Sequence, residues 1–291
     1  MCSSEQREVL ADLRASDFTV RNNETYRTNC FELLGISPDD TYPLAACNDC
    51  GFCYSPHLPS KGFLRIVYEN AIDHDRTITE TISYRRRFLE KLAIVLGELD
   101  DRPKKLLDFG CGYGHALRIL QMRDLRCFGF DISVERLRQA GLAATNDVQE
   151  VRERGPFDVI LCFDVLEHVS EPNEALEFLA AVSAPGGILA INVPDCSGMS
   201  TSGIRSAIQT GAARAINPWE HLNYFTPASL HAALRRYGFI PYRNIASPPK
   251  LGFAEEARGL GLVRNAVGVG LRRLRYREPL GTEVVCHRVL G

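Results

Sequence analysis

The most informative stretch of the chain is LLDFGCGYG, which occupies residues 106–114. Its apolar first half ends in three glycines at alternate positions, Gly110, Gly112 and Gly114, and a helical pattern begins at His115. Glycine is needed where a backbone turns sharply through a left-handed conformation, or where a ligand lies directly against it. The stretch therefore predicts a buried strand, a tight loop that binds a ligand, and a helix.

Three acidic residues accompany this loop. Asp108 precedes the first glycine, and because a carboxylate there would repel a diphosphate, the loop suits a ligand with an ammonium or sulfonium charge. Asp131 lies 23 positions after Asp108, close to the spacing at which an acid accepts hydrogen bonds from ribose hydroxyls. Asp147 follows a third expected strand, where an acid can face an adenine amino group. The alternative interpretation is a glycine turn beside unrelated acids that cap helices.

From residue 105 onward, apolar strand-like runs alternate with helical segments, which predicts a parallel sheet with helices on both faces. We expect seven strands, at residues 105–109, 127–131, 142–146, 158–163, 187–193, 239–246 and 282–289. The helices are expected to start near Gly114, Ser133, Asn173 and Pro227, with Thr226 as the N-cap of the last one. The expected fold class is α/β, with an open, doubly wound sheet.

The composition excludes several classes of protein. Hydrophobic residues make up 45% of the 291 positions and charged residues 24%, which excludes intrinsic disorder for most of the chain. A net charge of −2 provides no basic field for a nucleic acid, and no apolar run approaches the roughly 20 residues of a membrane span. The start of the chain lacks the apolar core of a signal peptide. We therefore expect a cytoplasmic protein that acts on a small molecule, without a nucleic-acid or membrane partner, and we leave a homodimer open.

Two segments resemble motifs of the class I S-adenosylmethionine-dependent methyltransferases. LLDFGCGYG is similar to the first motif of that family, and FDVILCFDVLEHV (residues 157–169) is similar to its fourth-strand motif. The resemblance extends from Tyr84 to Val289. It implies a seven-stranded Rossmann-like sheet with an antiparallel last strand, and S-adenosyl-L-methionine as the cofactor. The cofactor contacts that it implies are Asp108, Gly110, Cys111, Gly112, Gly114, Asp131, Ile132, Asp147, Val148 and Phe163.

The acceptor of the methyl group is expected beyond the carboxyl ends of the strands, where a histidine could remove its proton near neutral pH. The segments that fall there are residues 164–168 and 218–225. EHLNYFTPASL (residues 220–230) resembles the C-terminal signature of a subgroup that includes nucleotide-linked sugar C-methyltransferases. The resemblance implies Glu220 and His221 as elements of the general base, and His168 is a third catalytic candidate. For both histidines the alternative is a structural role, in which they close the pocket or hold the loop over the cofactor.

Two further features belong to the expected acceptor site. Trp219 and Tyr224 are aromatic neighbours of the signature and are expected to line the substrate pocket. Asp164, Glu167 and His168 also resemble the metal-binding acidic triplet of ubiquinone-type O-methyltransferases, with an aspartate in place of a glutamate.

Four cysteines between residues 30 and 53 form a candidate zinc site. CNDCG (residues 47–51) has the form of a zinc knuckle, a tight turn that points two thiolates at one ion. The same methyltransferase subgroup carries an N-terminal zinc ribbon, and CGFCYSPHLP (residues 50–59) is similar to its second half, whereas its first half is reduced to one cysteine. The expected ligands are Cys30, Cys47, Cys50 and Cys53, with His57 as a substitute for Cys53. A degenerate ribbon without metal and an iron–sulfur site are the alternatives.

We expect two domains. A small Cys-containing domain at residues 1–75 would open with a short helix at residues 5–13, and a methyltransferase domain would occupy residues 76–291, with a lid at 195–217 and an insertion at 247–281. The expected function is S-adenosylmethionine-dependent methyl transfer to an oxygen or carbon of a small molecule, such as a sugar or a secondary metabolite. Two alternatives stay open: a nicotinamide-dependent oxidoreductase, and a cofactor-binding scaffold without catalysis.

Overall fold

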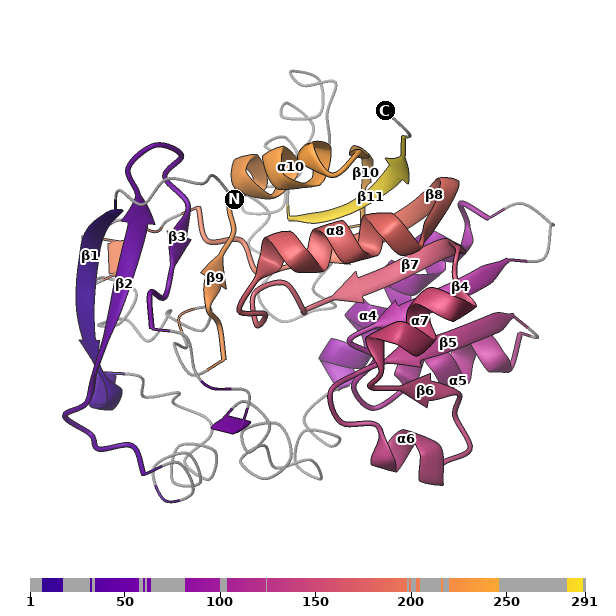
Figure 1. Cartoon of the computed structure of the whole chain (residues 1–291), viewed down its shortest axis with the longest axis horizontal. Coiled ribbons are helices and arrows are strands. Elements are labelled where there is room, and N and C mark those ends of the chain that lie inside the picture. The colour runs from indigo at the N-terminus through magenta and orange to yellow at the C-terminus, as the bar shows by residue number, and fades with distance from the viewer. Residues whose placement is uncertain are drawn as a thin grey trace, which may run out of the picture.

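A computed structural model of the chain contains two β-sheets (Figure 1). It describes residues 7–17, 32, 35–57, 60, 62–63, 82–99, 104–123, 125–197, 199, 203–204, 216, 220–245 and 282–289. Cys30, Trp219, the whole expected insertion at 247–281 and most of the expected lid at 195–217 lie outside the described residues.

The larger sheet has seven strands in the order β10-β11-β8-β7-β4-β5-β6. Their bounds are Lys105–Phe109 (β4), Arg126–Phe130 (β5), Ala144–Thr145 (β6), Phe157–Phe163 (β7), Ser183–Asn192 (β8), Phe239–Asn244 (β10) and Glu283–Arg288 (β11). Strands β4 to β8 pair in parallel, whereas β11 runs antiparallel to both of its neighbours, β8 and β10. The expected seven-stranded α/β sheet with an antiparallel last strand is therefore confirmed.

Helices cover both faces of this sheet (Figure 1). The described helices are α4 (Ile82–Leu96), α5 (His115–Gln121), α6 (Glu135–Gln139), α7 (Val148–Arg154), α8 (Pro172–Val182) and α10 (Pro227–Arg236). Because side chains alternate along a strand, Leu107 packs in one core with α8 and α10, while the neighbouring Leu106 packs in another with α4 and α5. The expected N-cap is confirmed, since the Thr226 side chain accepts a hydrogen bond from the backbone N–H of Ser229 in a capping box.

The smaller sheet joins the beginning of the chain to a strand from its last third. Its order is β1-β2-β3-β9, with β1 at Arg7–Arg14, β2 at Thr41–Cys47, β3 at Cys53–Tyr54 and β9 at Asn223–Tyr224, and all pairs are antiparallel. Leu13, Leu44 and Tyr224 are buried in its core. The expected boundary at residue 75 stays a prediction, but one strand of this sheet comes from beyond it.

The prediction of a helix at residues 5–13 was wrong. Residues 7–14 form β1, which pairs with β2 from Arg7 opposite Cys47 to Arg14 opposite Thr41. Pairing with a partner more than 25 positions away satisfies the backbone hydrogen bonds of this segment, and such tertiary contacts override a weak local helix preference. Across the described residues, helices long and apolar enough to span a membrane are absent.

Candidate functional site

The glycine loop lies at the carboxyl end of β4 and is tied to the end of β5. The backbone N–H groups of Gly110 and Cys111 both donate to the carbonyl oxygen of Phe130, at 2.8 and 3.1 Å. Gly110 has a φ of +79°, and a Cβ there would collide with the Val165 side chain. Gly112 has a φ of +48°, but the space that its Cβ would take is open. The first glycine is thus required by packing, whereas Gly112 presents open backbone to a ligand.

Two acids flank this loop and interact with each other. Asp108 is buried in β4, and this burial, together with the charge of Asp131, raises the pKa of Asp108 to about 7. Asp131 follows β5, and its two oxygens accept hydrogen bonds from the backbone N–H groups of Gly112 (2.8 Å) and Ser133 (3.1 Å). Burial also raises the pKa of Asp131, although these hydrogen bonds oppose the shift. A positively charged ligand beside the two carboxylates would relieve their mutual repulsion.

Apolar side chains are exposed beside these acids. Ile132 is 51% exposed and Val148 is 44% exposed, and they follow β5 and β6. Asp147 is exposed next to Val148, and one of its oxygens caps α7 by accepting from the backbone N–H of Gln149 at 2.8 Å. Phe163 ends β7 but is buried. Two large apolar side chains exposed at the carboxyl edge of a sheet are suited to contact a flat, apolar ligand group.

A polar network fixes the chain where β7 ends. Asp164 is the only non-glycine residue with a positive φ, 55°, in the described part of the chain. Its backbone N–H donates to the Asn192 carbonyl at 2.9 Å, and the Asn192 side-chain amide donates to the Asp164 carboxylate. Lys91 of α4 in turn donates to the Asn192 side chain and pairs with Glu283, both at 2.7 Å. Sequence reasoning missed Lys91 and Asn192, which belong to distant segments without a recognisable motif.

Glu167 and His168 follow in a turn, and the pKa of each side chain is shifted from its ordinary value. Burial and the charge of Asp164 raise the pKa of Glu167 well above its usual range, and its Oε2 atom finds no hydrogen-bond partner among the described residues. His168 Nδ1 lies 2.9 Å from the carbonyl oxygen of Glu220. Because a carbonyl only accepts, this contact assigns the proton to Nδ1 and leaves the lone pair on Nε2. Burial and the neighbouring His221 lower the pKa of His168 to about 3, so this imidazole is neutral at physiological pH.

The structure brings His221 to His168, 53 positions earlier in the sequence. Their ring centroids lie 4.8 Å apart at 68°. Glu167, His168 and His221 offer one ligand atom each within 4.8 Å of one another, a donor set suited to a divalent metal. The expected metal triplet shares Glu167 and His168 with this group, but its third member, Asp164, is replaced by His221.

The expected substrate residue Tyr224 and three of the expected metal ligands lie in the small sheet or in the turn between β2 and β3. Tyr224 is 1% exposed in its core, where burial raises the pKa of the hydroxyl, and the Oη atom lacks a hydrogen-bond partner within the described ranges. The knuckle turn is present, since Gly51 has a φ of +66° and its N–H donates to the Cys47 carbonyl at 2.8 Å. Cys53 is buried in β3 and Cys50 is exposed. In the part of the chain that the structure describes, Cys47, Cys50 and Cys53 do not form a three-ligand group.

The glycine loop and the acids beside it lie within a match to a known family. A family model described as "Methyltransferase domain" matches residues 81–242, which is more than half of the chain. The chain belongs to this methyltransferase family. The match covers every cofactor residue expected from the sequence, and also His168 and His221.

Two individual relatives match shorter stretches of the chain. A ubiquinone biosynthesis O-methyltransferase of Caulobacter sp. is 29% identical over 125 residues, covering 37% of this chain and 50% of the relative. The ajmaline N-methyltransferase of Rauvolfia serpentina is 31% identical over 134 residues, covering 39% of this chain and 46% of the relative. The chain thus spans about half the length of these curated relatives.

Two solved structures are similar to this chain at low identity and with TM-scores below 0.5. The 1,6-didemethyltoxoflavin-N1-methyltransferase of Burkholderia thailandensis, solved with S-adenosylhomocysteine, is 16% identical with a TM-score of 0.49, over 84% of this chain and 98% of that chain. A magnesium protoporphyrin IX methyltransferase from Synechocystis is 16% identical with a TM-score of 0.47, over 78% and 93%.

Proposed function

We propose that the protein transfers a methyl group from S-adenosyl-L-methionine to a small-molecule acceptor. The observation that carries this proposal is the pairing of two buried acids, Asp108 and Asp131, with the open backbone of Gly112. Such a site favours a ligand that joins a cationic group to hydroxyls, as the sulfonium and ribose of this cofactor do. A nicotinamide-dependent oxidoreductase is the alternative, and the carboxylate of Asp108 counts against it because a diphosphate would be repelled.

Five of the expected cofactor residues have individual roles in this proposal. Asp131 accepts hydrogen bonds from the ribose hydroxyls, and Asp108 provides negative charge near the methionine part. Ile132 and Val148 are exposed apolar side chains that contact the adenine ring, and Asp147 faces its amino group with the oxygen that does not cap α7. The cofactor itself supplies an activated methyl group on a sulfonium.

On the acceptor side, His221 removes the proton from the attacking group, and Glu220 assists it. His168 is a poor base for this step, because its lowered pKa of about 3 leaves the Nε2 lone pair with little affinity for a proton, and its Nδ1 proton is committed to the Glu220 carbonyl. It serves instead to orient the His221 segment. Trp219 is proposed to line the pocket; Tyr224, expected there from the sequence, instead lies buried in the core of the small sheet. Alignment of the attacking atom with the methyl group supplies much of the acceleration.

The chemical class of the acceptor is proposed as a hydroxylated small molecule, methylated at oxygen or carbon. The names of the relatives, which refer to ubiquinone biosynthesis and to ajmaline, support small acceptors for related enzymes. A divalent ion held by Glu167, His168 and His221 is a second way to activate a hydroxyl, and the unpartnered Glu167 Oε2 favours it. Loss of turnover with a chelator, restored by added metal, would distinguish this route from a metal-free base.

Several finer assignments stay predictions from the sequence: a zinc ion at Cys30, Cys47, Cys50 and Cys53, a cytoplasmic location, and a homodimer. Zinc content measured on purified wild type and on Cys50→Ser tests the first of them.

The test of the function is transfer of a labelled methyl group from S-adenosylmethionine to a panel of hydroxylated acceptors, sugar nucleotides first. We expect a labelled product with wild type, and a rate about 10²–10⁴-fold lower with His221→Asn, because that is the usual contribution of a general base. Cofactor affinity should stay within about twofold, since His221 lies outside the glycine loop. An unchanged rate in His221→Asn would remove the base assignment and leave methyl transfer standing. The absence of any product across the panel, despite cofactor binding, would support an inactive scaffold.

A further inference from the structure

Asn223, the first residue of β9, is a buried polar side chain that the proposed chemistry does not use. The residue is only 6% exposed. The side-chain amide donates to the carbonyl oxygens of Leu166 at 3.0 Å and Val169 at 2.7 Å, 57 and 54 positions away. Both N–H groups of the side-chain amide therefore donate to the same turn, which carries Glu167 and His168.

Backbone contacts reinforce the same junction. The N–H groups of Leu222 and Asn223 both donate to the carbonyl oxygen of Glu167, at 2.6 and 3.1 Å. Two adjacent residues thus direct four N–H donors at three carbonyls of the 166–169 turn. A junction this dense fixes one segment against the other more firmly than a single contact could.

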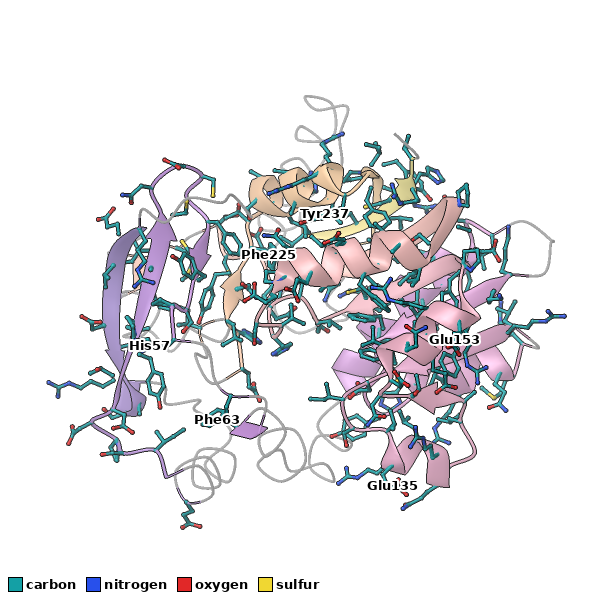
Figure 2. All side chains as sticks on the ribbon, viewed as in Figure 1. His57, Phe63, Glu135, Glu153, Phe225 and Tyr237 are labelled. Atoms are coloured by element: carbon teal, nitrogen blue, oxygen red, sulfur yellow. The ribbon has the colours of Figure 1, made fainter. Side chains whose placement is uncertain are left out.

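The small sheet holds the opposite side of this segment. The backbone N–H of Ser55 donates to the Leu222 carbonyl at 2.8 Å, and β3 pairs with β9 so that Tyr54 lies opposite Asn223. Phe225, which follows β9, packs its ring against Phe52 at 5.2 Å, and Figure 2 places it between the small sheet and helices α8 and α10. Residues 220–224 are therefore held between the small sheet and the 166–169 turn.

An asparagine is the side chain that this position requires. Its amide has two donors on a short stem, and here both face carbonyl oxygens. An aspartate of the same shape would turn an acceptor toward those oxygens, and a serine could satisfy only one of them. The choice of residue is thus explained by the turn that it clamps.

We propose that Asn223 is a positioning residue: it clamps the segment that carries Glu220 and His221 onto the 166–169 turn, and so sets the contact between His168 and His221. The hydrogen bond from His168 Nδ1 to the Glu220 carbonyl and the 4.8 Å separation of the two rings depend on this clamp. Its catalytic meaning rests on the proposed function, whereas the clamp itself does not.

The test uses NMR of the full chain with ¹⁵N-labelled histidine. The chain has 7 histidines, so His168→Asn and His221→Asn samples assign the two ring signals. In wild type we expect a slowly exchanging Nδ1–H signal from His168, because this proton is bonded to the Glu220 carbonyl in a partly buried site. In Asn223→Asp we expect that signal to be lost and the His221 ring signals to shift. Thr226→Ala, which removes the N-cap of α10 three residues later, is the matched control that lowers stability without touching the clamp.

The proposal is supported if the His168 signal disappears in Asn223→Asp and persists in Thr226→Ala at a comparable loss in melting temperature. It is overturned if the signal persists in Asn223→Asp, or if Thr226→Ala loses it equally. Should Asn223→Asp fail to fold, Asn223→Ser takes its place, and a His168 proton that exchanges at the wild-type rate in that variant overturns the proposal. Titration of the same samples with S-adenosylmethionine separates the clamp from the proposed function. If wild type binds the cofactor and the affinity of the variants stays within twofold, the proposed function stands, independently of the histidine signals.

Discussion

The cofactor end and the acceptor end of this site are built in different ways. The cofactor end uses the glycine loop, Asp131 and Asp147, which lie within about 40 consecutive positions and follow three neighbouring strands, β4, β5 and β6. The acceptor end joins the 166–169 turn to residues 220–224, and β3 from the beginning of the chain supports it. The first is fixed by local sequence, and the second exists only when the whole chain is folded.

This difference has consequences for substitution. At the cofactor end, backbone N–H groups and single acids make the site, so individual changes there should alter ligand affinity or local strain. At the acceptor end, hydrogen bonds between distant segments make the site, so changes there should alter geometry while cofactor affinity persists.

The largest effect on stability is expected at Asp108. Its folded-state pKa of about 7 lies above the ordinary 3.8, so the folded protein holds this proton more tightly than the unfolded chain. The resulting stability is fully present below about pH 4 and is lost as the pH rises through 7, by up to about 4 kcal/mol in the free energy of unfolding. Asp108→Asn carries no titrating group and should lose this part of the pH dependence. Urea unfolding of the ligand-free protein at pH 5 and pH 8 measures about 2.7 kcal/mol of this change, because about two of the roughly three pH units over which it develops lie in that window.

The control for this prediction is Asp12→Ala, because Asp12 is exposed on β1 and should leave the pH dependence as it is. If Asp108→Asn and wild type lost the same stability between pH 5 and pH 8, the buried Asp108 would not be the source of this pH dependence.

A smaller effect on stability is expected for alanine substitutions at two glycines of the same loop, and it should differ between them. Gly110→Ala should cost about 3 kcal/mol, since it combines a left-handed φ with a collision against Val165. Gly112→Ala should cost only about 1 kcal/mol, because its Cβ meets open space and only the φ is unfavourable. Chemical denaturation of both variants gives the difference. Equal losses would mean that Val165 moves aside, and that both glycines are required by conformation alone.

Much of the fold could be predicted from the sequence, because each central strand is a short apolar run that ends in a recognisable turn. The segment at residues 105–109 is the clearest case, and the structure has β4 at the same bounds. The first strand could not be predicted in this way. REVLADLR has no strong strand pattern, and it becomes β1 because β2 lies beside it.

The candidate site likewise contains residues that could be predicted from local sequence and contacts that only tertiary structure creates. Asp108 and Asp131 could be found from their spacing to the glycines, and the structure places them in electrostatic contact. His168 and His221 could be named individually, but their contact follows from tertiary structure. Asn223 lay within a quoted signature, yet its role depends on two carbonyls more than 50 positions away, which no local pattern could reveal.

The central claim is that the paired acids and the glycine loop bind S-adenosylmethionine, and calorimetric titration tests it most directly. Wild type should bind S-adenosylmethionine and S-adenosylhomocysteine at micromolar concentrations and should not bind NADH. Asp131→Ala should weaken cofactor binding about 100-fold, or about 2.7 kcal/mol, because two hydrogen bonds from ribose to a carboxylate are lost. Asp12→Ala on β1 should bind as wild type does. Binding of NADH in place of S-adenosylmethionine, or an unchanged affinity in Asp131→Ala, would contradict the account.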